Sequence, residues 1–355
     1  MTSASRDSLI PTLARETAEK LIAIAALSCA IELVFFKFLP DIATAVIQHS
    51  TSNLADFGQF QREYLGAGSV HHARFLGNIT LYHLARWLGT LYQSADIRLH
   101  PLRLAAAILT PIYAYMGAHF ALRDSRTLEW RYFLALYALM VVIGQYVFYP
   151  ADMPALAFLS MALFFLLRER LGITFALMLM TGLYRETSFH VVWLVASWAW
   201  CSRSRPPRVR LAWVGAFGFS FLCEYWLVRR FFPGPVSAAG GVILDPRVLF
   251  LDKSMLSLTN LCSVGLAVLF PLACLLRIRD IPAADWRRGF FTLNAWVFPG
   301  WLLFYRMMNG NLAEFRMLFP VLLPCIYAVA YAAVRGQSGT NRFSGPSAEV
   351  ANRVS

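Results

Sequence analysis

Residues 149–190 read YPADMPALAFLSMALFFLLRERLGITFALMLMTGLYRETSFH and contain the strongest indication of the fold class. This stretch consists mainly of apolar segments, yet Asp152 lies at the start of the first segment, and Arg185 and Glu186 lie in the middle of the next. Charge inside an apolar membrane segment is costly, and where it occurs it commonly serves a function. We therefore expect an α-helical membrane protein whose site is built from these charges.

The apolar run at residues 171–200 contains only two charged residues, Arg185 and Glu186. A single helix of this length would measure about 45 Å, whereas the hydrocarbon core of a bilayer is about 30 Å thick. Arg-rich segments at 168–170 and 203–210 flank the run, and short loops of this kind stay cytoplasmic. We expect two short helices that cross out and return, an arrangement tolerated where the helices line a protein cavity. A single crossing stays open as the alternative and would split the proposed site.

The composition supports the same class of protein. Of the 355 residues, 58% are hydrophobic and 15% are charged, against about 25% charged in soluble domains. The net charge of +12 comes mainly from arginines at loop ends, which indicates topology and contact with anionic lipid rather than nucleic-acid binding. The six cysteines lack metal-ligand spacing and are expected to be small core residues.

The predicted fold is all-α, a polytopic transmembrane helical bundle of about ten spans. One transmembrane domain, residues 20–335, follows a cytoplasmic leader at 1–19 and precedes a disordered cytoplasmic tail at 336–355. Residues 37–100 form the first periplasmic loop, and within it residues 76–92 have the spacing of a helix, either lying on the membrane interface or buried in a small loop domain. The spans are expected at residues 20–36, 101–122, 130–149, 153–167, two short segments within 171–200, 211–228, 256–276, 289–304 and 317–334.

The distribution of basic residues orients this bundle. The internal loops assigned to the cytoplasm contain 13 Arg and Lys residues, and the short outer loops contain 7. This bias places both termini in the cytoplasm and the protein in the inner membrane, as a multi-pass protein.

With this topology, isolated polar residues gather on the outer side of the membrane. Asp152 opens a span, where a carboxylate also favours the helix dipole. Arg185 and Glu186 are adjacent in sequence and do not face each other on a helix, so each needs another partner, in a structural ion network or in a ligand. The other members of this polar group precede the last span: Arg306, Asn309, Glu314 and Arg316.

Several short motifs occur in one order along residues 20–335. They are Asp56-Phe-Gly-Gln-Phe60 followed by Tyr64, Arg74-Phe-Leu, Asp152-x-Pro-Ala-Leu-Ala, Arg185-Glu-Thr, and Glu314-x-Arg316 before a Pro-containing span. In this order and spacing, the chain resembles bacterial polytopic membrane proteins of the GT-C glycosyltransferase superfamily. The resemblance implies transfer of a sugar from a polyprenyl-phosphate donor to a lipid, glycan or protein acceptor at the periplasmic face. It also implies a catalytic carboxylate in the first outer loop.

The residues of this chain suit that chemistry. Transfer needs a base to take a proton from the acceptor hydroxyl, and the departing phosphate needs cations. We expect Asp56 as the base, with Glu63 as its substitute. Many members of the superfamily have two adjacent acidic residues in the first outer loop, and this chain does not. Whether a divalent cation acts as a cofactor therefore stays open. The remaining roles are phosphate binding by Arg185, Arg306 and Arg316, anchoring of the loop or lipid by Arg74, orientation of the arginines by Asp152, Glu186 and Glu314, and substrate contact by Asn309.

Other functions remain open at this point. A flippase or exporter of a lipid-linked glycan would also need a polar cavity among broken helices, although no internal repeat is apparent. A glycan polymerase or ligase would use the same donor chemistry. A membrane scaffold without chemistry would tolerate loss of single charges in the outer cluster.

Overall fold

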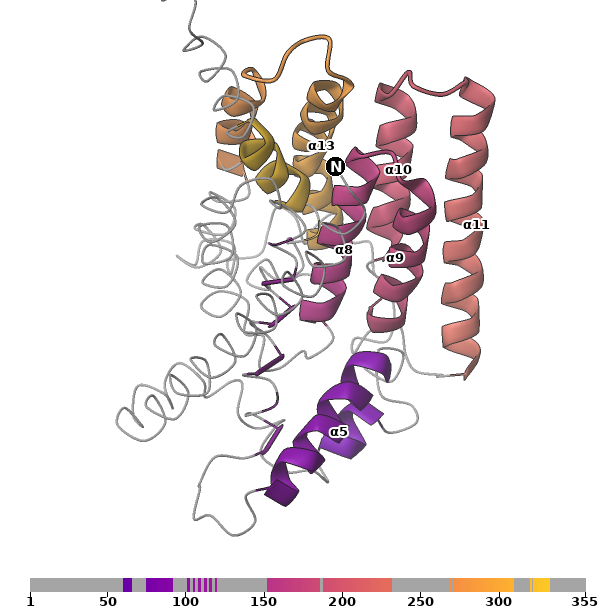
Figure 1. The fold of residues 1–355 in the computed structure, drawn as a ribbon, viewed down its shortest axis with the longest axis vertical. Helices are drawn as coiled ribbons and strands as arrows, with labels where there is room; N and C mark the ends of the chain where they lie inside the picture. Colours follow the sequence, from indigo (N-terminus) through magenta and orange to yellow (C-terminus); the bar gives the residue numbers. More distant parts are fainter. Residues whose placement is uncertain are drawn as a thin grey trace, which may run out of the picture. The chain divides into compact units, whose positions relative to one another are not determined.

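The computed structural model describes residues 60–65, 75–91, ten positions between 101 and 119, 152–185, 188–231, 268–309 apart from 270, and 320–332 apart from 321. These residues form helices joined by turns, and no strand occurs among them (Figure 1). The all-α class is therefore confirmed for this part of the chain. The expected leader and tail, and the first span at 20–36, lie outside it.

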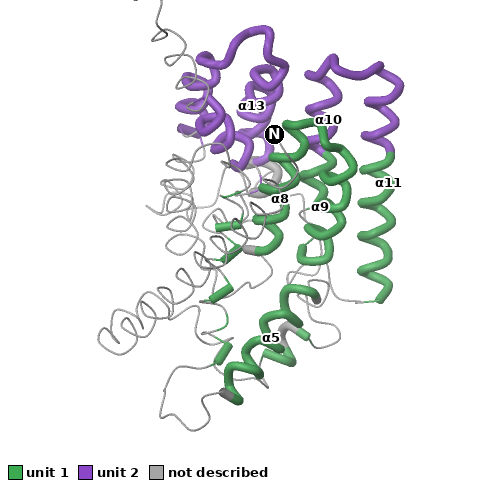
Figure 2. Tube along the Cα trace, in the orientation of Figure 1, with its two compact units in different colours: residues 1–120, 130–192, 216–242 green, residues 121–129, 193–215, 243–355 purple. Residues whose placement is uncertain are grey.

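The chain divides into two compact units (Figure 2). The described elements of the first unit are η1 (Gln61–Leu65), α5 (Phe75–Leu91), α8 (Asp152–Leu167), α9 (Leu171–Tyr184), the start of α10 (Phe189–Cys201) and the end of α11 (Pro207–Phe231). The second unit contains the rest of α10, the first part of α11, α13 (Trp286–Asn309), and helical residues at 271–278 and 322–332.

Helices α8 and α9 pack against each other through a tight turn at residues 168–170. The Arg170 N–H donates to the Phe165 carbonyl at 2.9 Å, and the Glu169 N–H donates to the Leu166 carbonyl at 2.8 Å. This pair of bonds is the Schellman arrangement, which satisfies the last carbonyls of a helix. It requires a left-handed residue after the helix end, and Glu169 takes that role with φ 57°. The turn reverses the chain within three residues.

Helices α9 and α11 run side by side in the same direction within the first unit. Phe175 meets Phe217 edge-on, with ring centroids 5.2 Å apart, and seven residues further along both helices Gly182 lies against Glu224. Seven residues are about two helical turns, so both contacts fall on one face of each helix. Since the two helices are parallel, the chain must run back between them. The sequence predicted an out-and-back path through residues 171–200.

Helix α5 packs through one face and exposes the other. Leu81, Ala85 and Leu88 are buried in a cluster with Phe60 and Leu102, whereas Trp87 is 59% exposed. The sequence left open whether this helix is buried in a loop domain or lies on an interface. Its packed face fits the first alternative, and its exposed Trp87 is the kind of side chain that interfaces attract.

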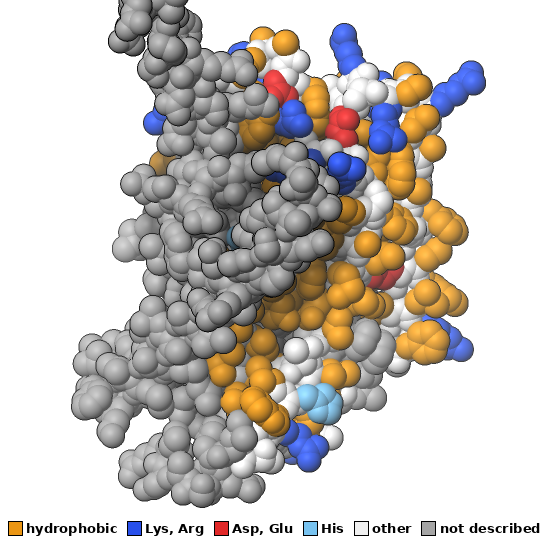
Figure 3. Space-filling model, viewed as in Figure 1, with side chains coloured by type: hydrophobic (Ala, Val, Ile, Leu, Met, Phe, Trp, Pro, Cys, Tyr) orange, Lys and Arg blue, Asp and Glu red, His pale blue; other side chains and the backbone are white. Residues whose placement is uncertain are grey.

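Helix α11 is the one described helix that is long and apolar enough to cross a membrane. Its 25 residues include an 18-residue window of mean hydropathy 1.4, of which 6% is buried. Figure 3 shows hydrophobic side chains along this helix, and the basic residues at its two ends are all arginines. An apolar surface of this extent is characteristic of contact with lipid or with another apolar partner. Its exposed large residues include Leu211, Phe219, Leu222, Trp226 and Phe231.

The other apolar helices are shorter, and two of them lie where the sequence predicted a broken pair. Helix α8 has 16 residues, α9 has 14 and α10 has 13. The expected break is confirmed, since α9 ends at Tyr184 and α10 begins at Phe189. A helix of 14 residues is about 21 Å long, which is less than the hydrocarbon core of a bilayer. Ten spans remain a prediction.

Polar contacts stabilise the second unit at the start of α13 and between α10 and α13. Asp285 precedes α13 and accepts hydrogen bonds from the Arg287 N–H at 3.1 Å and from the Tyr331 hydroxyl at 2.8 Å. Deeper in the unit, Trp193 in α10 donates its indole N–H to Asn294 in α13 at 2.9 Å. Cys274 and Cys325 are buried as expected, whereas Cys201 and Cys223 are half-buried.

Arg210 caps the C-terminal end of α10. Its guanidinium donates to the carbonyls of Ala199 and Ser202, which belong to the last turn of that helix and its exit. The last carbonyls of a helix have no partner within the helix and carry negative partial charge, so a guanidinium stabilises them. The sequence placed Arg210 among the loop arginines that set topology. The structure adds this local role, whereas Arg203, Arg205 and Arg208 are exposed.

Candidate functional site at the break between α9 and α10

Helix α9 ends without a proline. Thr181 donates its hydroxyl to the Leu177 carbonyl at 2.7 Å, and the Arg185 N–H donates to the Thr181 carbonyl at 2.8 Å. Arg185 itself is extended, with φ −164° and ψ 147°. Ser188, of a residue type favoured at helix starts, precedes α10. The chain therefore leaves the helix at Arg185 and resumes it four residues later.

Arg185 is the only predicted site residue whose side chain the structure describes, and it is 4% exposed. Burying a guanidinium is costly unless hydrogen bonds and opposite charge compensate it. The buried imidazole of His190 is close enough to interact electrostatically with this charge, and it packs against Phe189 with ring centroids 4.0 Å apart. A buried cation at a helix break is the strongest sign of a site in the described part of the chain.

Aromatic rings meet at Tyr184, the residue before this cation in the sequence. Tyr184, directly before Arg185, stacks on Phe158 of α8 with ring centroids 5.5 Å apart. Its hydroxyl lies 3.5 Å from that of Tyr113, and the two rings meet edge-on at 6.3 Å. Three segments of the first unit thus meet at Tyr184. A guanidinium and an aromatic ring on adjacent residues suit a ligand that combines an anion with an apolar or ring-shaped part.

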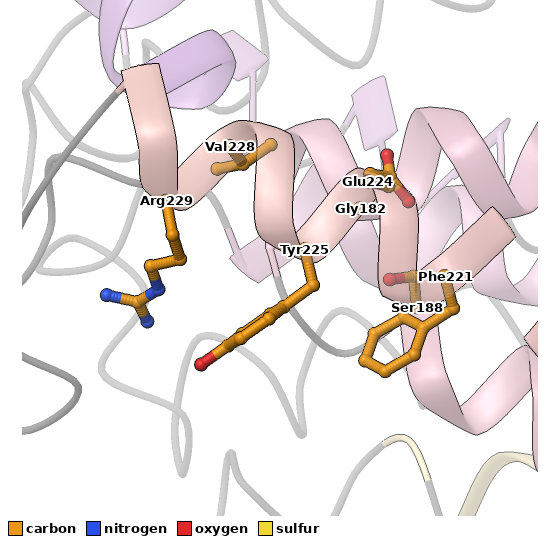
Figure 4. A pocket seen from close by; sticks show the side chains of 7 residues that line it. All are labelled: Gly182, Ser188, Phe221, Glu224, Tyr225, Val228 and Arg229. Carbon is orange, nitrogen blue, oxygen red and sulfur yellow. The ribbon is translucent and has the colours of Figure 1, made fainter. Parts of the chain in front are cut away.

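A cleft opens beside the same break, within the first unit (Figure 4). Gly182 and Ser188, which bracket the break, form one wall, and the second half of α11 forms the other. The side chains from α11 include those of Phe221, Glu224, Tyr225 and Arg229.

The structure describes the backbone at four further predicted site residues. Glu63 lies in η1, Asp152 begins α8 as expected, and Arg306 and Asn309 lie near the end of α13. The first unit contains Glu63, Asp152 and Arg185, and the second contains Arg306 and Asn309. Their assembly into one site therefore stays a prediction. The remaining predicted site residues lie outside the described part of the chain: Asp56, Arg74, Glu186, Glu314 and Arg316.

Glu224 is the polar residue that sequence reasoning missed. It is the only charged residue between Leu211 and Val228, and an acidic residue within such a run marks a candidate site by itself. That signal was available in the sequence. The neighbours of Glu224 in the cleft could not be predicted from the sequence, because they depend on the packing of α9 beside α11.

Among the described residues, no group of three or more His, Cys, Asp and Glu side chains is placed to hold a metal ion. The question of a divalent cation concerns Asp56 and its neighbours, which lie outside those residues.

Comparison with known proteins gives no family. No protein-family model, no curated protein and no solved structure matches this chain.

Proposed function

We propose that this protein is a membrane glycosyltransferase that moves a sugar from a polyprenyl-phosphate donor to a lipid, glycan or protein acceptor at the periplasmic face of the inner membrane. The observation that carries the proposal is Arg185, a buried cation at the break between two apolar helices too short to cross a bilayer alone. The resemblance to the GT-C superfamily supplies the reaction.

Arg185 suits the donor side of this reaction. The leaving polyprenyl phosphate gains negative charge as the glycosidic bond breaks, and a fixed guanidinium in water-poor surroundings stabilises that charge strongly. Arginine also binds phosphate oxygens through two parallel hydrogen bonds, which orients the group as well as neutralising it. Tyr184 and Phe158 would flank the sugar or the first isoprene units.

The other roles follow the motifs. Asp56 is the proposed base that takes the proton from the acceptor hydroxyl, and Glu63 is its substitute. Arg306 and Arg316 assist Arg185 with the phosphate. Asp152, Glu186 and Glu314 orient these arginines, Arg74 anchors the outer loop or the lipid, and Asn309 contacts the substrate.

The proposed topology has about ten spans with both termini in the cytoplasm. Support for membrane insertion comes from the exposed apolar surface of α11, bounded by arginines at both ends. The parallel course of α9 and α11 supports an out-and-back path through residues 171–200.

The experiment is mass spectrometry of envelope glycans and lipids from a deletion strain. The strain carries the wild-type chain, Asp56→Asn, Arg185→Lys, or Arg203→Lys at matched abundance. Arg203 is exposed in the loop between α10 and α11 and serves as the matched arginine control. We expect a sugar that disappears in the deletion strain, returns with the wild-type chain and the control, and stays absent with the other two variants.

Two outcomes would overturn the proposal. Full restoration by both Asp56→Asn and Arg185→Lys would favour transport or scaffolding, because these two functions need neither the proposed base nor the proposed phosphate ligand. An unchanged set of glycans in the deletion strain would exclude transfer to the envelope altogether.

A further inference from the structure

Two buried cysteines of the second unit lie against each other. Cys274 belongs to the helical residues 271–278, the Cys274 helix, and Cys325 to the helical residues 322–332, the Cys325 helix. Each cysteine is 1% exposed, and a hydrogen bond joins their side chains. Both are thiols rather than halves of a disulfide. Two segments on opposite sides of α13 in the sequence thus bring two sulfur atoms together.

The polar contact at the start of α13 accounts for this meeting. The 2.8 Å hydrogen bond from Tyr331 to Asp285 holds the end of the Cys325 helix beside the turn that precedes α13. The Cys274 helix ends at Ile278 and leads into the same turn. Cys325 lies six residues before Tyr331 and Cys274 four residues before Ile278, distances of about 9 Å and about 6 Å along a helix axis. Measured from this turn, the two thiols lie at similar depths in the unit.

The pairing of two thiols adds chemistry to what is otherwise ordinary packing. A small apolar residue such as alanine would also fill a tight core position, and a thiol is only a weak hydrogen-bond donor. Two thiols in contact, however, can be oxidised to a disulfide with little movement of the chain. The same oxidation is much slower for thiols that must first meet.

We propose that Cys274 and Cys325 are a reversible oxidation site, at which hydrogen peroxide converts the two thiols into a disulfide. In the first step one sulfur attacks the peroxide, the O–O bond breaks, and a sulfenic acid and one water form. In the second step the other sulfur attacks the sulfenic sulfur, the S–S bond forms, and the S–O bond breaks. The proton of the second thiol leaves with the hydroxyl group as another water. The two thiols lose two electrons, and the peroxide gains them.

The disulfide would tie together the two helices that come before and after α13 in the chain. The loop that it closes contains all of α13, including Arg306 and Asn309. A cross-link of this kind stabilises the folded state, mainly by restricting the unfolded chain. It also prevents the Cys274 helix and the Cys325 helix from separating. The inference does not depend on the proposed function.

The test treats the full-length chain in lipid nanodiscs with increasing amounts of hydrogen peroxide. Dimedone, present throughout, traps sulfenic acids that meet no thiol, and N-ethylmaleimide added on denaturation labels the thiols that remain. Digestion without a reductant, followed by mass spectrometry, identifies the linked cysteines. The half-buried Cys201 and Cys223 are the matched controls, because neither is hydrogen bonded to another described cysteine.

We expect one main linked product. Peptides joined through Cys274 and Cys325 should exceed every other linked pair about tenfold or more, because groups held in contact react faster than groups that must first meet. Dithiothreitol should separate them. At the same dose Cys201 and Cys223 should be trapped by dimedone. Cys325→Ser should abolish the linked product and leave the sulfenic acid of Cys274 to dimedone, since the second thiol is gone.

Two results would overturn the inference. If Cys274 and Cys325 are recovered as thiols at a dose that traps Cys201 and Cys223, peroxide does not oxidise the pair. If the bond between Cys274 and Cys325 is no more abundant than bonds to other cysteines, the two thiols are not held in contact. Both results are read from the wild-type chain, so misfolding of a variant produces neither.

Discussion

Replacing Glu169 by glycine should stabilise the turn between α8 and α9. Glu169 has φ 57° because the two hydrogen bonds that close the turn require a left-handed residue at that position. For a residue with a Cβ atom this conformation costs about 1–2 kcal/mol, whereas glycine adopts it without that cost. Glycine also loses more backbone entropy on folding, by about 0.5–1 kcal/mol. The expected net gain is about 0.5–1 kcal/mol.

A series of substitutions at this position separates backbone strain from charge. Asparagine tolerates left-handed φ, glutamine retains the strain without the charge, and valine, being β-branched, increases the strain. The expected order of stability is Gly, then Asn, then Gln close to wild type, and Val lowest. Thermal unfolding of the purified full-length chain, followed by loss of the monomer peak in gel filtration, should show a rise in Tm of about 1–3 °C for Glu169→Gly.

The comparison between Glu169→Gln and Glu169→Gly is decisive. If glutamine raises Tm as much as glycine, the gain comes from removing the charge, and the strain argument is wrong. If glycine lowers Tm, contacts of the Glu169 side chain outweigh the strain of its backbone. Either result would refute the assignment of Glu169 as a strained helix end.

Three further predictions concern polar contacts. Burial raises the pKa of Asp285, but hydrogen bonds from Arg287 and Tyr331 and the charge of Arg287 outweigh it, so that pKa lies below its ordinary value of 3.8. The ionised carboxylate therefore contributes stability above about pH 4, and this contribution is lost as the pH falls through the folded pKa. The difference in Tm between wild type and Asp285→Asn should therefore shrink on acidification. A difference that grew would contradict this prediction. Arg210→Lys should lower stability by about 1 kcal/mol, since lysine retains the charge but not the planar fork that caps α10, and an unchanged Tm would show that the cap is dispensable. Asn294→Leu should cost about 1–3 kcal/mol by leaving the indole N–H of Trp193 without its acceptor, and the same thermal assay with Asn294→Asp, which retains an acceptor oxygen, is its control.

The approximate positions of helices α8 to α11 could be predicted from the sequence alone. Helix α8 begins at Asp152 and ends at Leu167, within a residue of the expected span, and α9 and α10 fall on either side of the expected break. These bounds depend on where apolar runs meet charged residues, which is local information. The same holds for α11, whose expected core at 211–228 lies inside the observed helix.

The site was only partly accessible to the same reasoning. Arg185 could be selected because a charge in an apolar run is conspicuous in any sequence. The contacts of Tyr184 with Tyr113 and Phe158 could not, since these two residues come from segments distant along the chain. Glu224 was equally conspicuous, yet nothing local connects it with Gly182.

Local sequence information therefore predicted the helical class, the approximate positions of helices α8 to α11 and the charged residues that apolar surroundings make costly. Only the tertiary structure decided that Gly182 faces Glu224, and that Arg210 turns back onto α10 while its neighbouring arginines face outward. The physical reason is that hydropathy and helix ends depend on residues within a few turns of each other. Which helix faces meet depends on how side chains distant in sequence pack together.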